Sequence, residues 1–110
     1  MIYSICMTQD GNPVVIDGSK YIHIHEDNSD LIKAMYGKYA SHWNGLRGRD
    51  FLPHIDAAKC YLESTILIDA TRLTPYCGKP WSDPRVVLNA FKWLKKGCEL
   101  YPDAIVEVDT

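Results

Sequence analysis

The sequence predicts a single α+β domain in which helices pack on one face of an antiparallel sheet. Three observations favour this class. Apolar runs separated by Asp-Gly turns open the chain, helical periodicity follows in its middle, and a strongly marked helix precedes a final β-rich run. We expect the element order βββ-α-α-β-α-β, with no repeat, low-complexity run or linker that would divide residues 1–110 into more than one domain.

The N-terminal part of the chain predicts a three-stranded antiparallel meander. Residues Ile2–Thr8 alternate loosely and are rich in β-branched and aromatic side chains. Asp10-Gly11 and Asp17-Gly18 are turn signals, because glycine supplies the positive φ that a tight hairpin needs. These turns join the first strand to Val14–Ile16 and then to Lys20–His25, the second and third strands.

Two helices are predicted in the middle of the chain. Asp27–Asp30 offers N-cap residues for the first, and Asn44-Gly45 ends it. Its apolar face repeats at helical spacing through Ile32, Met35, Tyr36, Tyr39 and Trp43. The second helix starts at Pro53 and turns Ile55, Ala58 and Leu62 inward. Glu63–Ala70 could continue this helix, but the β-rich run Thr65–Ile68 fits a buried strand better.

The last helix and the last strand carry the clearest signals. Ser82 or Asp83 caps the helix, and Pro84 takes its first turn. Gly97 is the expected residue just beyond its end. The face that we expect in the core consists of Val87, Phe91 and Leu94. A final strand follows over Ala104–Val108.

Composition restricts the class of protein. A hydrophobic fraction of 46% and a charged fraction of 24% are typical of a folded chain, and a net charge of −2 implies no whole-molecule attraction to nucleic acid or to an anionic membrane. No apolar run approaches the roughly 20 residues that span a bilayer. Met1–Met7 lacks the basic region of a signal peptide, so we expect a cytoplasmic protein without membrane partners.

The four cysteines form no CxxC pair, and in a reducing compartment we expect free thiols and no disulfide. Cys77 lies in an irregular segment and is the thiol that we expect to be the most reactive or exposed. We expect no cofactor.

Metal binding and catalysis are weakly indicated. His23 and His25 alternate on one face of the third strand and could ligate a metal with His54, Asp56 or Cys60. A solvated strand face explains the same pattern, so we expect no metal site. His54 and Asp56 make a poor dyad because residues two apart on a helix do not face each other. With no catalytic motif in the chain, we lean against an enzyme.

The segment Leu31–Arg49 contains basic residues and no acid. Its basic residues alternate with aromatic ones, as on surfaces that bind single-stranded nucleic acid, although the helical spacing favours the aromatics as core. In Asn44–Asp50, Arg47 and Arg49 alternate with glycines that would let the backbone approach an anion. An ordinary surface loop with either arginine paired to Asp50 is the competing interpretation.

The segment Thr71–Pro84 is rich in proline and predicted to be irregular. Long ordered loops are commonly functional, and solvent-facing Tyr76 and Trp81 would be natural anchors for a partner. Arg72 and Lys79 add positive charge there. The alternative is that Trp81 folds back over the core and closes one end of the sheet.

These features predict a small non-enzymatic protein-binding module of the inhibitor, adaptor, immunity or phage-encoded modulator kind. No motif indicates these classes; the prediction rests on how frequent small domains without catalytic motifs are among them. The expected partner-binding residues are Arg47, Arg49, Arg72, Tyr76, Lys79 and Trp81. The alternative is a nucleotide or single-stranded nucleic-acid binding domain that uses the Arg47/Arg49 loop and the Tyr76/Trp81 loop.

Overall fold

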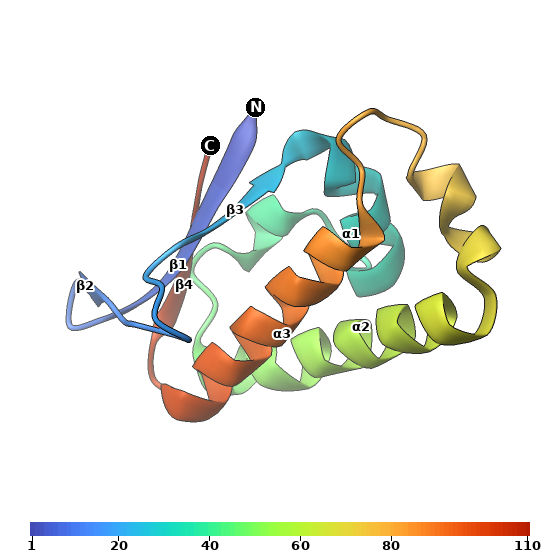
Figure 1. Ribbon diagram of the computed structural model, residues 1–110. Coiled ribbons are helices and arrows are strands. Elements are labelled where there is room, and N and C mark those ends of the chain that lie inside the picture. Colours follow the sequence, from blue (N-terminus) through green and yellow to red (C-terminus); the bar gives the residue numbers. More distant parts are fainter.

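The computed structural model describes all residues from Met1 to Thr110. Its antiparallel sheet is built around one central strand, β1 (Ile2–Gln9). On one side β1 pairs with β4 (Ile105–Asp109), and on the other with β3 (Ile22–His25) and the short β2 (Asn12–Pro13). The helices cover a single face of this sheet, so the predicted α+β class is confirmed (Figure 1).

Both predicted Asp-Gly turns are present. Asp10 and Gly11 have φ values of 54° and 80°, and Asp17 and Gly18 have 51° and 77°, which is the left-handed backbone that such hairpin turns require. The meander itself is corrected, because β3 pairs with β1 and not with the second strand. Ile16 leaves the sheet to lie in the core, where its carbonyl accepts a hydrogen bond of 2.9 Å from the Trp93 indole.

The first predicted helix is divided into two. The turn η1 (Glu26–Asn28) leads into α1 (Ser29–Tyr36), which ends at Gly37 with a left-handed φ of 101°. A separate 3₁₀ turn, η2 (Ala40–Trp43), then inserts Trp43 into the core. Because the helix stops, Tyr39 does not continue the apolar face and is 40% exposed.

The second helix is longer than predicted. α2 (Gly48–Asp69) begins before Pro53 and runs through Thr65–Ile68, so the strand predicted there is wrong. A further 3₁₀ segment, η3 (Ala70–Tyr76), continues from its end. The residues that α2 turns toward the core extend the predicted inward face by one more turn: Ile55, Ala58, Leu62 and Ile66. Packing of this face against the rest of the core outweighs the β-propensity of the local sequence.

The last helix, α3 (Pro84–Leu100), starts as predicted, since the Asp83 side chain accepts a hydrogen bond of 2.9 Å from the Arg85 N–H. Its end is corrected, because Gly97 lies inside the helix and is buried. A Cβ at this position would lie 2.5 Å from Ile16 Cδ1 and 2.6 Å from Met7 Sδ. Gly97 therefore allows the helix to approach the sheet closely and is not its C-terminal stop.

The core lies between the sheet and the helices. The predicted core residues Val87, Phe91 and Leu94 are all fully buried, and the ring of Phe91 lies 6.2 Å from that of Trp43. α2 and α3 pack side by side on the covered face of the sheet (Figure 1). None of the helices combines the length and the apolar character that crossing a membrane requires.

Candidate protein-binding surface

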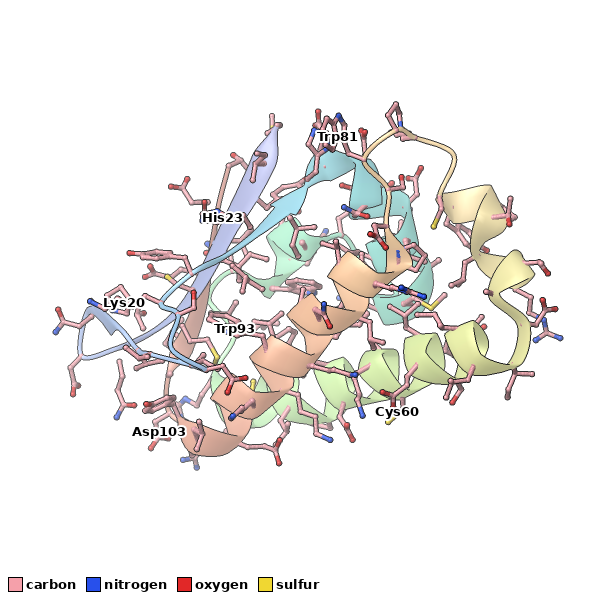
Figure 2. The ribbon with its side chains drawn as sticks, viewed as in Figure 1. Lys20, His23, Cys60, Trp81, Trp93 and Asp103 are labelled. Atoms are coloured by element: carbon pink, nitrogen blue, oxygen red, sulfur yellow. The ribbon has the colours of Figure 1, made fainter.

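The expected partner-binding residues lie in two separate places. Arg47 is the N-cap of α2, and Arg49 lies in its first turn. Arg72 follows the other end of the helix, and a helix of 22 residues is about 33 Å long. Figure 2 shows Trp81 and Asp103, the ion-pair partner of Arg49, on opposite sides of the molecule. The two loops are therefore not brought together into one basic, aromatic patch.

The Arg47–Asp50 segment has a structural role. Arg49 pairs with Asp103, which replaces the expected pairing with Asp50. Gly48 approaches the backbone rather than an anion, because a Cβ there would lie 2.8 Å from the carbonyl oxygen of Tyr101. This segment therefore holds the start of α2 against the turn that enters β4.

Trp81 is exposed and yet held in place. Its side chain is 68% exposed, so it does not close over the core. Its ring stacks on His25 with centroids 5.8 Å apart, and the backbone N–H of Trp81 donates to Asp27 Oδ2 at 3.2 Å. The carbonyl of Trp81 accepts a bond of 3.3 Å from the buried amide of Asn28. An aromatic side chain that is both exposed and fixed is a suitable anchor, since little freedom is lost on binding.

Tyr76 and Lys79 lie between Arg72 and Trp81 along the chain, and both are exposed. Tyr76, which is 39% exposed, lines a shallow hollow beside α1 together with Lys33 and Tyr39. The Lys33 ammonium group lies 4.8 Å from the centre of the Tyr39 ring.

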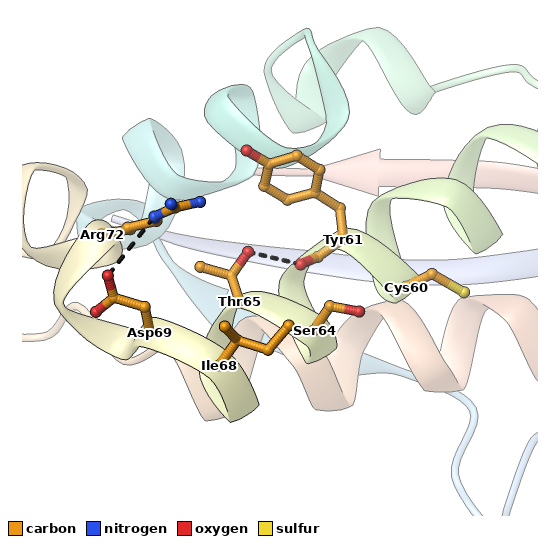
Figure 3. Close-up of a pocket in the computed structure, with 7 residues that line it drawn as sticks. All are labelled: Cys60, Tyr61, Ser64, Thr65, Ile68, Asp69 and Arg72. Atoms are coloured by element: carbon orange, nitrogen blue, oxygen red, sulfur yellow. Dashed lines mark hydrogen bonds and ion pairs between the residues drawn. The ribbon is translucent and has the colours of Figure 1, made fainter.

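The two most exposed apolar residues, Leu67 and Ile68, lie on the outer face of α2, within the run Thr65–Ile68 that the sequence predicts as a buried strand. Leu67 is 80% exposed, Ile68 84% and Tyr61 59%. Tyr61 and Ile68 border a hollow that reaches Arg72, whose guanidinium lies 3.6 Å from Asp69 Oδ2 (Figure 3). We call Tyr61, Ser64, Leu67 and Ile68 the α2 outer face. The sequence does not indicate this face, because a β-rich apolar run is more typical of a buried strand than of an exposed helix.

The charged residues in the middle of α2 lie on the flank next to α3. Asp56 pairs with Lys95 at 2.9 Å, and Glu63 pairs with Lys59 at 3.2 Å and with Lys92 at 3.3 Å. The hydrogen bond from Lys95 holds the pKa of Asp56 below its ordinary value, and bonds from Lys59 and Lys92 do the same for the pKa of Glu63. The outer face is therefore left without charge of its own.

The cysteines are free thiols in different environments. Burial raises the pKa of Cys77, and Asp83 raises it further, which disfavours the reactive thiolate expected at this position. Burial raises the pKa of Cys98 to about 12. Cys60 is the exposed thiol and lies beside the α2 outer face.

The histidines lie in three separate surroundings. His23 lies on the open face of the sheet, where its Nδ1 is 2.9 Å from Ser4 Oγ, and His25 Nδ1 accepts a bond of 3.1 Å from the Asp27 N–H. His54 borders a hollow with other polar groups that spacing alone did not relate: Tyr36, Lys38, His42 and Asp50. They come from α1, the link that follows it, η2 and α2, so only the tertiary structure brings them together.

Comparisons with known proteins give no relative for this chain. No protein-family model, no curated protein and no solved structure matches it.

Proposed function

We propose that this chain is a non-enzymatic protein-binding module, of the inhibitor or adaptor kind, that acts on another protein in the cytoplasm. The observation that carries the proposal is the α2 outer face, on which Leu67 and Ile68 are 80% and 84% exposed. Tyr61 and Ile68 are seven residues apart, so they share one side of α2 and border the same hollow, and Leu67 lies about 100° around the helix from Ile68. Exposed apolar groups that share a helix face, rather than being scattered singly, are typical of protein-interaction sites. Nothing in the fold itself requires two aliphatic side chains at these positions.

The polar surroundings of this face support the same function. Arg72 lies at its edge and belongs to a residue type that is enriched at interface centres together with aromatic residues. Tyr76, Lys79 and Trp81 follow along the chain and would extend the contact beyond η3. Arg47 and Arg49 lie at the far end of α2, so we propose the contact without them.

Affinity capture from the source cells tests the proposal, with the wild-type chain compared with Ile68→Asp and Trp81→Ala. We expect Ile68→Asp to lose the captured partner, because a carboxylate would be desolvated in the contact. Trp81→Ala should reduce recovery if the contact extends past η3. The matched control is Val15→Asp, a substitution of an aliphatic residue that is 48% exposed on the hairpin segment. Equal recovery with wild type and Ile68→Asp, or no partner at all, would contradict the proposal.

A further inference from the structure

His25 ends β3 and lies between the turn η1 and the Trp81 ring. Its Nδ1 accepts a hydrogen bond of 3.1 Å from the Asp27 N–H, and this bond caps η1. Its ring stacks on the indole of Trp81, with centroids 5.8 Å apart and an angle of 28° between the planes. One imidazole therefore contacts both the turn after β3 and the segment that leads into α3 (Figure 2).

The bond from the Asp27 N–H depends on the protonation state of His25. An imidazole nitrogen accepts a hydrogen bond only when it carries no proton, so the geometry fits a neutral ring with its proton on Nε2. Histidine is the side chain whose charge ordinarily changes between about pH 5 and pH 8. A proton taken up at Nδ1 converts this acceptor into a donor, and the bond to the Asp27 N–H is then lost.

The carboxylate of Asp27 offers the new proton an acceptor. Asp27 Oδ2 lies 3.6 Å from His25 Nδ1, and the two side chains are only 16% and 29% exposed. A charge-assisted hydrogen bond is about 2.7–2.9 Å long, so a small rotation of the Asp27 side chain closes the gap once the ring is charged. Partial burial protects the resulting ion pair from the screening that weakens fully exposed pairs.

Asp27 is the only charged group within ion-pair distance of the His25 ring. Glu26, its neighbour on η1, is paired with the Met1 ammonium group at 3.2 Å. The other titratable or charged groups on the strand, on the segment packed against η1 and at the start of α3 form no ion pair with His25: His23, Lys79, Asp83 and Arg85. A charge on the His25 ring therefore acts first on Asp27 and on the indole of Trp81.

The stacked geometry favours the charged ring. A cation that lies over the face of a tryptophan ring is attracted to it within about 6 Å of the ring centre. The two ring centres of His25 and Trp81 lie 5.8 Å apart, and the planes are nearly parallel. Proton binding by His25 therefore adds a cation–π attraction to a contact that consists of stacking alone when the ring is neutral.

The bonds that hold the backbone near Trp81 do not require His25 to be neutral. The Trp81 N–H donates to Asp27 Oδ2 at 3.2 Å, and its carbonyl accepts from the Asn28 amide at 3.3 Å. The Ser82 hydroxyl donates to the Asp27 carbonyl at 2.7 Å. An ionised carboxylate has enough lone pairs to accept from both the Trp81 N–H and a charged His25. Proton binding therefore changes how firmly the indole is held while the segment stays in place.

We propose that His25 is a pH-sensitive clamp on Trp81, which holds the exposed indole more firmly below about pH 6 than at neutral pH. The neutral ring caps η1 and stacks on Trp81. The protonated ring exchanges the cap bond for an ion pair with Asp27 and binds the indole as a cation. The inference rests on the proposed function in one respect, because Trp81 belongs to the contact proposed above, and a firmly held indole loses less freedom when a partner binds.

A double-mutant cycle of His25→Gln and Trp81→Ala tests the clamp on the full chain. Urea denaturation at about pH 5 and at about pH 8 gives the coupling between the two side chains, as a factor in the unfolding equilibrium constant, for each charge state of His25. We expect the coupling factor to be about two- to fivefold larger at the lower pH, which is the range of a cation–π contact at an exposed site.

A second cycle, of His23→Gln and Trp81→Ala, is the matched control. His23 lies on the same strand, but its Nδ1 is 2.9 Å from Ser4 Oγ and its ring does not stack on Trp81. We expect no coupling between His23 and Trp81 at either pH. A circular-dichroism melt confirms that each variant is folded.

The wild-type chain supplies a measurement that does not depend on the folding of any variant. The NMR order parameter of the Trp81 indole N–H should be higher at about pH 5 than at about pH 8, because the clamp restricts the motion of the ring. Trp93 is the internal control, since its indole N–H bonds to the Ile16 carbonyl at 2.9 Å and should keep the same order parameter at both pH values.

Each outcome decides for or against the clamp. Equal coupling at both pH values would show that the rings stack whatever the charge of His25, and would overturn the inference. Coupling that is larger at the higher pH, or an order parameter of Trp81 that does not rise in acid, would overturn it as well. Both measurements use the isolated chain, so their failure leaves the α2 outer face untouched, and failure of the capture experiment leaves the clamp untouched.

Discussion

Asn28 is the residue that holds the Trp81 segment against the turn after β3. It is a polar residue in the core, only 1% exposed. Its Oδ1 accepts from the Asp83 N–H at 2.8 Å, and its amide donates to the carbonyls of His25 and Trp81 at 3.2 and 3.3 Å. One side chain thus orients the start of α3, the end of β3 and the backbone at the exposed tryptophan.

Replacing Asn28 with Ala should lower the free energy of unfolding by about 1–3 kcal/mol, because main-chain groups that it satisfies would be left without partners. Urea denaturation measures this change. Asn89→Ala, on the exposed side of α3, is the matched control and should stay within about 0.5 kcal/mol of wild type. Equal stabilities of the two variants would show that water replaces the bonds of Asn28.

At this scale the helix caps were predictable from the sequence, and the bonds that Asn28 makes to distant residues were not. Asp83 and Pro84 carry out the roles that their order in the sequence predicts, since a cap and a first-turn proline act on neighbouring residues. Asn28 was only one of several N-cap candidates for α1, yet it makes no cap bond there. Two of its partners, Trp81 and Asp83, are 53 and 55 residues away in the sequence.

At the scale of the elements, Gly48 sets how closely α2 approaches the chain that enters β4. Its N–H donates to the Ala104 carbonyl at 2.8 Å, and a Cβ would lie 2.8 Å and 3.2 Å from the carbonyl oxygens of Tyr101 and Pro102. Gly48→Ala should therefore destabilise the protein by about 1–3 kcal/mol, since backbone cannot move aside as a flexible side chain can.

Chemical denaturation of Gly48→Ala beside Gly78→Ala tests this prediction. A Cβ at Gly78 meets nothing within 4 Å, so this control should show no comparable loss. A gain in stability for Gly48→Ala, as helix propensity alone would give, would contradict the close approach.

The ion pairs between α2 and α3 predict a dependence of stability on pH. The pKa values of Asp56 and Glu63 are held below their ordinary values by lysine partners. A carboxyl group whose folded pKa is lowered stabilises the fold above its unfolded pKa, and this contribution is lost as the pH falls through the folded value. The stabilisation is therefore complete at neutral pH and declines below about pH 4.

The variant Asp56→Asn with Glu63→Gln isolates this contribution. Its Tm should lie slightly below that of wild type at neutral pH, because these pairs are exposed, and the difference should vanish once the pH falls below the folded pKa values of both carboxyl groups. Thermal melts across this range measure it. A difference that grows as the pH falls would reverse the sign and contradict the assignment.

At the scale of the whole molecule, one aromatic cluster joins the helices beneath the sheet. Phe91 from α3 and Phe51 from α2 pack on Trp43, with ring centroids 6.2 Å and 5.7 Å from it. Phe91→Ala should lower the free energy of unfolding by about 3–5 kcal/mol, as for other fully buried aromatic residues. A circular-dichroism melt that hardly moves, as expected for the surface control Leu67→Ala, would place α3 outside the core.

The candidate site was predictable only in part. The sequence indicates the segment with Arg72, Tyr76, Lys79 and Trp81, because a proline-rich irregular run that contains aromatic residues can be recognised without knowledge of the fold. The α2 outer face was missed because apolar runs usually indicate burial, and Leu67 is exposed.

The sequence by itself determined what depends on neighbouring residues: both Asp-Gly turns, the capped start of α3 and the apolar face that buries Phe91. The tertiary structure decided the rest. Because α2 packs against the core, it continues through a β-rich run. β3 pairs with β1 and not with the strand before it in the sequence. Gly97 lies inside α3, where the helix approaches the sheet closely. Each of these outcomes depends on contacts between residues distant in the sequence, and their packing energy exceeds the weak local preferences that a sequence displays.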